Sequence, residues 1–219
     1  MIITIDGPAG AGKSTVARQL ARRLGFQYLD TGAMYRAVAL VGFQRGVDWG
    51  RPEQLVAVAE SLQIELDDDR TIVDGEDVSR AIRTAEVTAI THYAADNPDI
   101  RAVLVRRQQE MAGRKNVVTE GRDQGTVVFP DATCKFFVTA SPEERARRRL
   151  IDLERQGEKT TLQAVLGAQT QRDRRDASRE VGPLVKADDA VEVVTDGMSI
   201  EQVVERLVEL IQRQTGVLP

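Results

Sequence analysis

A glycine-rich segment near the amino terminus has the residue types and spacing of a phosphate-binding loop. Residues 7–15 are GPAGAGKST, which fit the pattern G-x-x-x-x-G-K-[ST]. Glycines allow the tight turn in which successive N–H groups point at an anion. Lys13 is placed to reach the outer phosphates of a nucleotide, and the Ser14 hydroxyl to bind Mg²⁺. The predicted ligands of a nucleoside triphosphate are Gly7, Pro8, Ala9, Gly10, Ala11, Gly12, Lys13, Ser14 and Thr15.

The elements on either side of this loop are those that a phosphate-binding loop requires. Residues 2–5, IITI, form a β-branched run typical of a buried parallel strand. Apolar residues then recur at helical spacing up to Gly25, a predicted stop signal, so we expect a helix whose positive end faces the phosphates. A glycine-rich turn that matches by chance is the alternative, and the order of strand, loop and helix disfavours it.

The rest of the chain repeats the alternation of strand and helix. Short apolar runs predict further strands, with helical patterns between them, and this rhythm is typical of an α/β fold with a doubly wound parallel sheet. The predicted strands are FQYLD at 26–30, NVVTE at 116–120, CKFFVTA at 134–140 and AVEVVTD at 190–196.

Two segments interrupt this alternation. Residues 62–78 alternate polar and apolar side chains around DDD and DG, which predicts a small antiparallel hairpin. Residues 169–179, QTQRDRRDASR, are dense in charge and nearly free of apolar side chains, so a solvated helix face is the simplest interpretation.

Composition excludes several classes of function. The net charge of −4 and the 4% content of aromatic residues disfavour nucleic-acid binding, and the early charge and glycine disfavour a signal sequence or membrane span. We therefore expect a cytoplasmic protein without nucleic-acid or membrane partners. Cys134 is the single cysteine, which excludes an internal disulfide and predicts a buried thiol.

The abundance of arginine indicates what accepts the phosphoryl group. The chain has no N-K-x-D motif for guanine, one histidine (His92) and no evident base with an orienting partner, and no pair of residues that would position water was identified. A phosphate monoester is already anionic, needs no base, and benefits from guanidinium groups that offset the repulsion between two polyanions. The composition therefore favours a kinase whose acceptor is itself a phosphate.

Six segments of the sequence occur together in one known family. They are ITIDGPAGAGKST, YLDTGAMYR, DGEDVSRAIRT, EGRDQGTVVFPDA, SPEERARRR and QRDRRDASR. In the order and spacing of these segments the sequence resembles the bacterial cytidylate kinases along nearly its whole length. That resemblance implies transfer of the γ-phosphate of MgATP to CMP or dCMP by a monomer, and it accounts for the hairpin as part of an inserted nucleoside monophosphate-binding domain. The implied parts are a core at 1–30, 116–151 and 181–219, a monophosphate-binding excursion at 31–115 and a helical lid at 152–180.

The resemblance also assigns roles to individual residues. It implies that Arg36, Arg122 and Arg179 act with Lys13 on the transferring phosphoryl group, and that Asp123 accepts the cytosine 4-amino group. The residues implied to bind CMP are Thr31, Tyr35, Arg36, Arg101, Arg122, Asp123, Arg172, Asp176 and Arg179. In this set the phosphate ligands are Thr31, Arg36, Arg122 and Arg179. Tyr35 forms a wall of the pocket, Arg101 contacts the cytosine ring, and Arg172 and Asp176 contact the ribose.

Several structural alternatives stay open beside these roles. Thr31 could also be a helix N-cap, Ser141 with Glu144 is expected to form a capping box, and Arg145 and Arg149 could reach ATP or lie on a solvated face. His92 stands where the family usually has a serine, so that contact is not carried over.

Two other functions also stay open. One is a kinase of another small acceptor such as UMP or AMP, and the other is a nucleotide-binding regulatory module that hydrolyses ATP without any acceptor.

Overall fold

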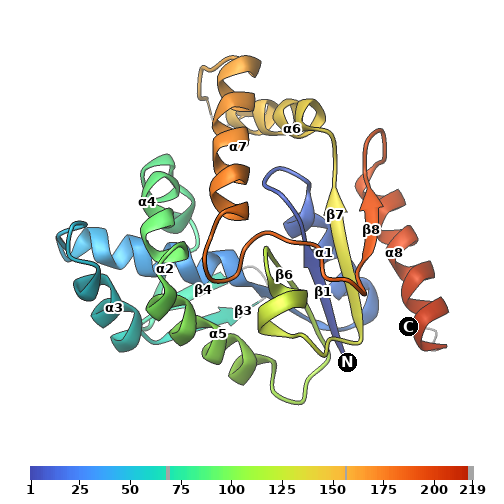
Figure 1. Ribbon diagram of the computed structural model, residues 1–219, viewed down its shortest axis with the longest axis horizontal. Helices are drawn as coiled ribbons and strands as arrows, with labels where there is room; N and C mark the ends of the chain where they lie inside the picture. Colours follow the sequence, from blue (N-terminus) through green and yellow to red (C-terminus); the bar gives the residue numbers. More distant parts are fainter. Residues whose placement is uncertain (68–69, 156, 217–219) are drawn as a thin grey trace.

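The centre of the protein is a five-stranded sheet surrounded by helices (Figure 1). The computed structural model describes residues 1–67, 70–155 and 157–216. The strands lie in the order β2-β6-β1-β7-β8, and every neighbouring pair is parallel. Each forms where a strand was predicted, which confirms the α/β fold: β1 (Ile2–Asp6), β2 (Gln27–Asp30), β6 (Val117–Gly121), β7 (Cys134–Thr139) and β8 (Val191–Val194).

Helices connect these strands and cover the sheet. Gly25 ends α1 with a left-handed backbone conformation, as predicted. The α-helices are α1 (Lys13–Leu24), α2 (Thr31–Gln44), α3 (Pro52–Ser61), α4 (Ala85–Ala95), α5 (Pro98–Ala112), α6 (Pro142–Arg155), α7 (Leu162–Ala177) and α8 (Ile200–Thr215); η1 (Ala81–Arg83) is a 3₁₀-helix and η2 (Gln124–Val128) a single π-helical turn.

A second, antiparallel sheet lies beside α2. It consists of β3 (Ile64–Asp67), β4 (Arg70–Val73) and β5 (Glu76–Asp77), in that order. The predicted hairpin therefore forms as β3 and β4, and a short third strand extends it. Residues 68 and 69, in the predicted turn, lie outside the described residues.

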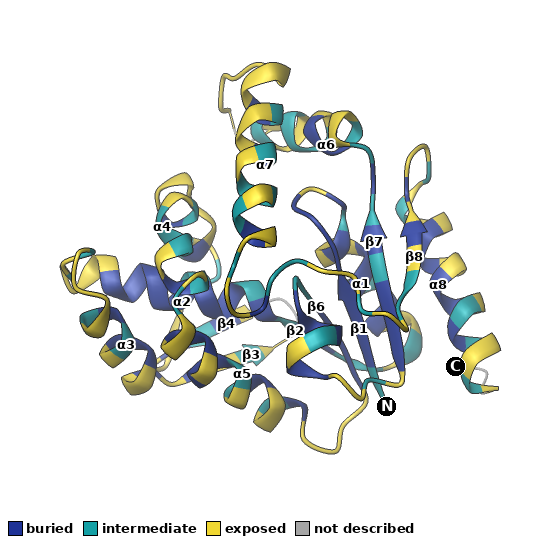
Figure 2. Ribbon diagram, in the orientation of Figure 1, coloured by how far each residue is buried: buried dark blue, intermediate teal, exposed yellow. Residues whose placement is uncertain are grey.

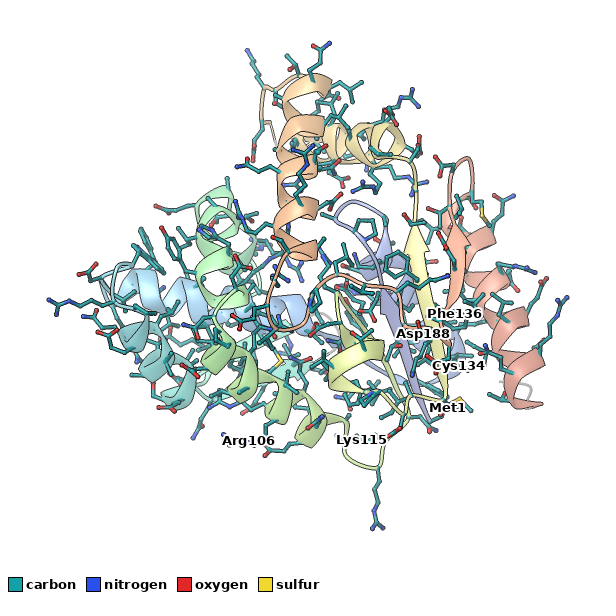
Figure 3. All side chains as sticks on the ribbon, viewed as in Figure 1. Met1, Arg106, Lys115, Cys134, Phe136 and Asp188 are labelled. Carbon is teal, nitrogen blue, oxygen red and sulfur yellow. The ribbon has the colours of Figure 1, made fainter. Side chains whose placement is uncertain are left out.

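The hydrophobic interior is divided into two main clusters. One joins α2 to α3, α4, α5 and the small sheet, and the other packs α1 and α8 against the large sheet. Figure 2 shows the central strands β1, β6 and β7 and much of α2 as largely buried. Cys134 and Phe136 lie on β7 in the second cluster (Figure 3), which confirms the predicted buried thiol. Within the described ranges, no helix combines the length and apolarity needed to cross a bilayer.

The capping box predicted at the start of α6 forms only in part. Ser141 Oγ accepts the backbone N–H of Glu144 at 3.3 Å, but the Glu144 carboxylate pairs with Arg148 instead of returning to Ser141. The N–H of Ser141 donates to Asp196, which lies before α8 and supplies a stronger, charged acceptor. The prediction was therefore wrong in its second half. A complete capping box occurs at Ser199, at the start of α8.

Asp6 joins the central strand to the turn that follows β6. It is the last residue of β1, and its carboxylate accepts the backbone N–H groups of Gln124 at 2.8 Å and Gly125 at 2.7 Å. Burial raises the pKa of Asp6 to about 6, although these two hydrogen bonds oppose the rise. The carboxylate therefore fixes η2 relative to β1 while it carries an unfavourable buried charge at neutral pH.

Asp6→Asn should change how stability depends on pH. A carboxyl group whose pKa is raised on folding binds protons more tightly in the folded state, so its contribution to stability grows as the pH falls through the folded pKa. We expect the free energy of unfolding of the wild type, relative to the variant, to rise by about 2 kcal/mol between about pH 7 and about pH 4.5. Urea unfolding at several pH values measures this difference, and parallel profiles for the two proteins would contradict it.

Candidate active site

The P-loop, residues 7–15, adopts a conformation that only glycine accommodates at three positions. Backbone φ is +145° at Gly7, +78° at Gly10 and +84° at Gly12. A Cβ atom at Gly7 would lie 2.0 Å from the carbonyl oxygen of Val138, on the neighbouring strand β7. The loop therefore emerges from β1 in close contact with the sheet and leads directly into α1.

Lys13, the first residue of α1, is buried beneath this loop. Its Nζ donates to the carbonyl oxygen of Pro8 at 2.8 Å. Burial, and next the charge of Arg122, hold the pKa of Lys13 well below its ordinary value, while Glu120 opposes the shift. A phosphate group beside Nζ would supply the negative charge that this position lacks.

The carboxyl end of β6 contributes both a side chain and a carbonyl group to the site. The Ser14 hydroxyl donates to Glu120 Oε1 at 2.8 Å, and the Thr31 hydroxyl donates to the backbone oxygen of Glu120 at 2.7 Å. Thr31 does not cap α2, because Asp30 does so by accepting the N–H of Ala33 at 3.0 Å. The N-cap alternative for Thr31 was therefore wrong.

Ser14 and Glu120 fit a magnesium ion that arrives with a nucleotide. Mg²⁺ in nucleotide sites binds one or two protein oxygens, and phosphates and water complete its octahedron. The hydroxyl of Ser14 and the carboxylate of Glu120 are oxygen ligands of this kind, adjacent to each other beside the P-loop.

The two residues expected to contact cytosine are paired with each other. Arg101 is buried on α5, and its Nη2 donates to Asp123 Oδ2, while Nη1 donates to the carbonyl of Ala95 at 3.2 Å. The guanidinium carbon lies 5.5 Å from the ring centre of Tyr35, which is buried, as expected for a pocket wall. Arg101 Nε is buried without a hydrogen-bond partner among the described residues. A buried donor and a buried carboxylate are thus available to a ligand that separates them.

Arg122 and Arg179 converge on one carboxylate. Asp176 of α7 is buried, accepts Arg122 Nε at 2.8 Å, and accepts Arg179 Nη2; Arg172 Nε lies 4.0 Å away. Burial alone would raise the pKa of Asp176, but the arginines outweigh it and hold the pKa below its usual range. The segment 169–179, for which a solvated helix face was the simplest interpretation, therefore places the carboxylate of Asp176 in the interior of the site.

Arg36 and Arg172 carry positive charge that is poorly compensated in this arrangement. Arg36 is half-buried and forms no hydrogen bond or ion pair with any described residue. Burial lowers its pKa, and the charge of Asp30 opposes the shift. Burial, and next the charge of Arg122, lower the pKa of Arg172 to about 10. This excess of positive charge suits a polyanionic ligand.

The structure defines the surroundings of Arg145 and His92, for which the sequence left alternatives open. Arg145 is buried and donates to the carbonyl of Ala9 at 2.9 Å, so it contacts the P-loop backbone and is not on a solvated face. His92 Nδ1 lies 2.8 Å from the carbonyl oxygen of Ala89, and its ring is tilted against that of Tyr93.

Sequence reasoning missed four acidic residues of the site. Asp6 and Glu120 end predicted parallel strands, where ligands of such sheets collect, so their positions could have revealed them. Asp96, which accepts Arg179 Nε at 2.6 Å, and Asp173, which pairs with Arg145, had no comparable signal. Both are defined only by long-range packing, because Asp96 ends α4, which packs against α2, and Asp173 lies on α7 beside the P-loop.

A family model for cytidylate kinase matches residues 3–213 of this sequence. The chain belongs to the cytidylate kinase family. The resemblance inferred from the motifs is therefore confirmed over nearly the whole length, whereas the roles of individual residues stay predictions.

Relatives within the cytidylate kinase family include proteins of two different lengths. A cytidylate kinase from Rhodopirellula baltica is 52% identical over 212 residues, which are 97% of this chain and 93% of the relative. A bifunctional pantoate ligase/cytidylate kinase from Synechococcus sp. (strain WH7803) is 51% identical over 215 residues, which are 95% of this chain but 44% of the relative. The chain thus spans less than half of the bifunctional protein.

A comparison with solved structures supports the kinase fold. Shikimate kinase from Bacteroides thetaiotaomicron superimposes with a TM-score of 0.50 at 16% identity, over 97% of this chain and 98% of that one. At this identity the likeness concerns the fold alone. The predicted P-loop α/β fold of a cytidylate kinase is therefore confirmed.

Gly7→Ala should disrupt the P-loop. The added Cβ would meet the carbonyl of Val138, a backbone atom that cannot move without shifting β7. Gly25→Ala is the matched control, because Gly25 also has positive φ (+66°) but nothing within 4 Å of its Cβ position. We expect the control to lose about 1 to 2 kcal/mol of unfolding free energy from backbone strain alone. Gly7→Ala should lose clearly more, with ATP binding abolished; equal losses in denaturant unfolding would contradict this account.

Proposed function

We propose that this chain is an ATP-dependent cytidylate kinase that transfers the γ-phosphate of MgATP to CMP and to dCMP. Family membership supports the reaction class. The observation that carries the proposal is the convergence of Arg122, Arg179 and Arg172 on a buried carboxylate at the carboxyl end of the sheet, beside the P-loop. An acceptor phosphate would be a second anion for guanidinium groups that already bind the carboxylate of Asp176.

The proposed mechanism is a direct in-line transfer without a covalent enzyme intermediate. The acceptor phosphate is anionic at neutral pH, so no general base is needed, and the protein contributes alignment and charge compensation. Lys13 and Arg122 would bind the transferring group, Arg36 and Arg179 the acceptor phosphate. Mg²⁺, held by Ser14 with Glu120 nearby, would neutralise charge on the donor phosphates.

Selection of the base is proposed to depend on Asp123 and Arg101. Cytosine offers an amino group that a carboxylate can accept, whereas uracil presents a carbonyl oxygen that the same carboxylate repels. The cytosine base would replace the present contact between Asp123 and Arg101, with Tyr35 as a wall of the pocket. Arg172 and Asp176 are proposed to contact the ribose.

The proposed division of the chain follows its two main hydrophobic clusters. The monophosphate-binding excursion is placed at 31–115, the lid at 152–180 and the core in the remaining residues; one cluster lies within the excursion and the other within the core. We further propose that the protein acts as a monomer in pyrimidine nucleotide metabolism in the cytoplasm.

The test is ADP release from MgATP with CMP, dCMP, UMP, AMP, GMP or no acceptor, in parallel. We expect rapid release with CMP and dCMP, and a loss of about 100-fold or more in Lys13→Ala with each of them, because one charge-stabilising group is removed. A preference for UMP or AMP would change the assigned acceptor but would keep the proposed phosphoryl transfer. Release that ignores the acceptor would indicate a regulatory nucleotide-binding module.

Asp123→Asn should weaken the discrimination between CMP and UMP. The amide keeps the size of the side chain but can donate to the uracil carbonyl as well as accept from cytosine, so the ratio of kcat/KM values should fall about tenfold or more. Asp131→Asn is the control, because Asp131 is exposed on the loop before β7. If Asp123→Asn keeps the wild-type ratio, the assigned base contact is wrong.

A further inference from the structure

Helix α7 contacts the P-loop through Asp173, a residue without a role in the proposed chemistry. The Asp173 carboxylate accepts the backbone N–H of Ala9 at 3.3 Å and pairs with Arg145 Nη1 at 2.6 Å. The side chains of Asp173 and Arg145 are 20% and 7% exposed, so the pair is largely shielded from water. A shielded charge-assisted contact of this kind fixes geometry more strongly than a surface ion pair does.

Arg145 is itself fixed to the P-loop. Its Nη1 donates to the carbonyl of Ala9 at 2.9 Å and its Nε to the carbonyl of Ala140 at 3.1 Å. Gln169, one turn before Asp173 on α7, donates to the carbonyl of Arg145 at 3.3 Å and lies against Gly10. Gln169 and Asp173 form the docking surface of α7. This surface contacts the turn of the P-loop itself and does not rest on a mobile side chain.

The same helix reaches the acceptor side of the site. Asp176 follows Asp173 by three residues, so the two side chains project from neighbouring positions on one face of α7. Asp176 contacts Arg122 and Arg179, and Arg172 lies on the same turn. Figure 1 shows α7 descending from α6 over the carboxyl end of the sheet. One rigid helix thus joins the P-loop to the arginines of the acceptor site.

We propose that Asp173 is a positioning residue that docks α7 on the P-loop and thereby couples binding of the phosphate donor to binding of the acceptor. This inference rests on the proposed function. In the docked arrangement Arg172 lies close enough to influence the charge of Lys13, and Arg36 is unpaired with any described side chain. Both substrates are polyanions, so each stabilises the arrangement that gathers these positive charges, and each lowers the cost of docking for the other.

The negative charge of Asp173 does not oppose the binding of anionic substrates, because Arg145 neutralises that charge. Asp173→Asn keeps an acceptor for the Ala9 N–H but removes the ion pair with Arg145, so docking of α7 weakens while every substrate contact proposed above is retained. Asp152→Asn is the matched control, since Asp152 is an exposed acid on α6 whose ion-pair partner, Arg155, lies on the same helix.

Calorimetric titration of CMP, with and without saturating Mg²⁺ and the β,γ-imido analogue of ATP, tests the coupling. For the wild type and Asp152→Asn we expect the analogue to tighten CMP binding roughly 5- to 30-fold, the range of ordinary coupling between sites. For Asp173→Asn we expect the analogue to tighten CMP binding by a factor near one. The affinity for CMP in the absence of the analogue should change by less than about threefold. A merely structural role would alter stability and leave the coupling factor unchanged.

The outcomes separate this inference from the proposed function. Wild-type protein that binds no CMP contradicts the function itself. Wild-type protein that binds CMP without coupling, or an Asp173→Asn variant that keeps the wild-type factor, overturns the inference and leaves the function intact. Arg145→Lys repeats the test from the other side of the pair if Asp173→Asn does not fold, because lysine keeps the charge but cannot span Ala9, Ala140 and Asp173 together.

Discussion

Positive charge concentrated at the carboxyl end of the sheet is the constraint on which this structure depends. Lys13, Arg36, Arg122 and Arg172 lie within electrostatic reach of one another, and burial lowers the pKa of three of them, Lys13, Arg36 and Arg172. Repulsion of this kind is tolerated only where nearby carboxylates offset it. Asp176 does so for the arginines, and Asp123 for Arg101. The carboxylates of Asp123 and Asp176 therefore hold these positive groups together at the carboxyl end of the sheet.

The parallel register of the sheet brings these groups to one edge. In the register of the sheet, Asp30 on β2 lies opposite Glu120 on β6, and Asp6 on β1 lies opposite Gly121 on β6. The three strands therefore end at the same level. Polar residues at these ends meet the P-loop on one side and α7 on the other. The geometry needed to align two phosphates thus follows from strand order and register before any loop is considered.

The sequence predicted the local parts of this arrangement better than its long-range contacts. The P-loop and the five strands of the large sheet carry strong local signals, namely glycine spacing and β-branched runs. The charged segment at 169–179 carries no local signal that distinguishes a solvated face from a buried contact. Asp173 contacts Ala9 and Arg145, which are 164 and 28 residues away, and Asp176 contacts Arg122, which is 54 residues away. Thr31 and Ser141 were assigned helix-capping roles that nearby aspartates modify: Asp30 caps α2 instead, and Asp196 takes the N–H of Ser141.

The order of strands in the large sheet also constrains how the chain folds during synthesis. β1 is the first strand made, but its neighbours are β6 and β7, which begin at residues 117 and 134. The cluster formed by residues 33–104 is contiguous in sequence and can assemble while β1 still has no partner. The P-loop is thus synthesised before the two strands that hold β1 in the large sheet.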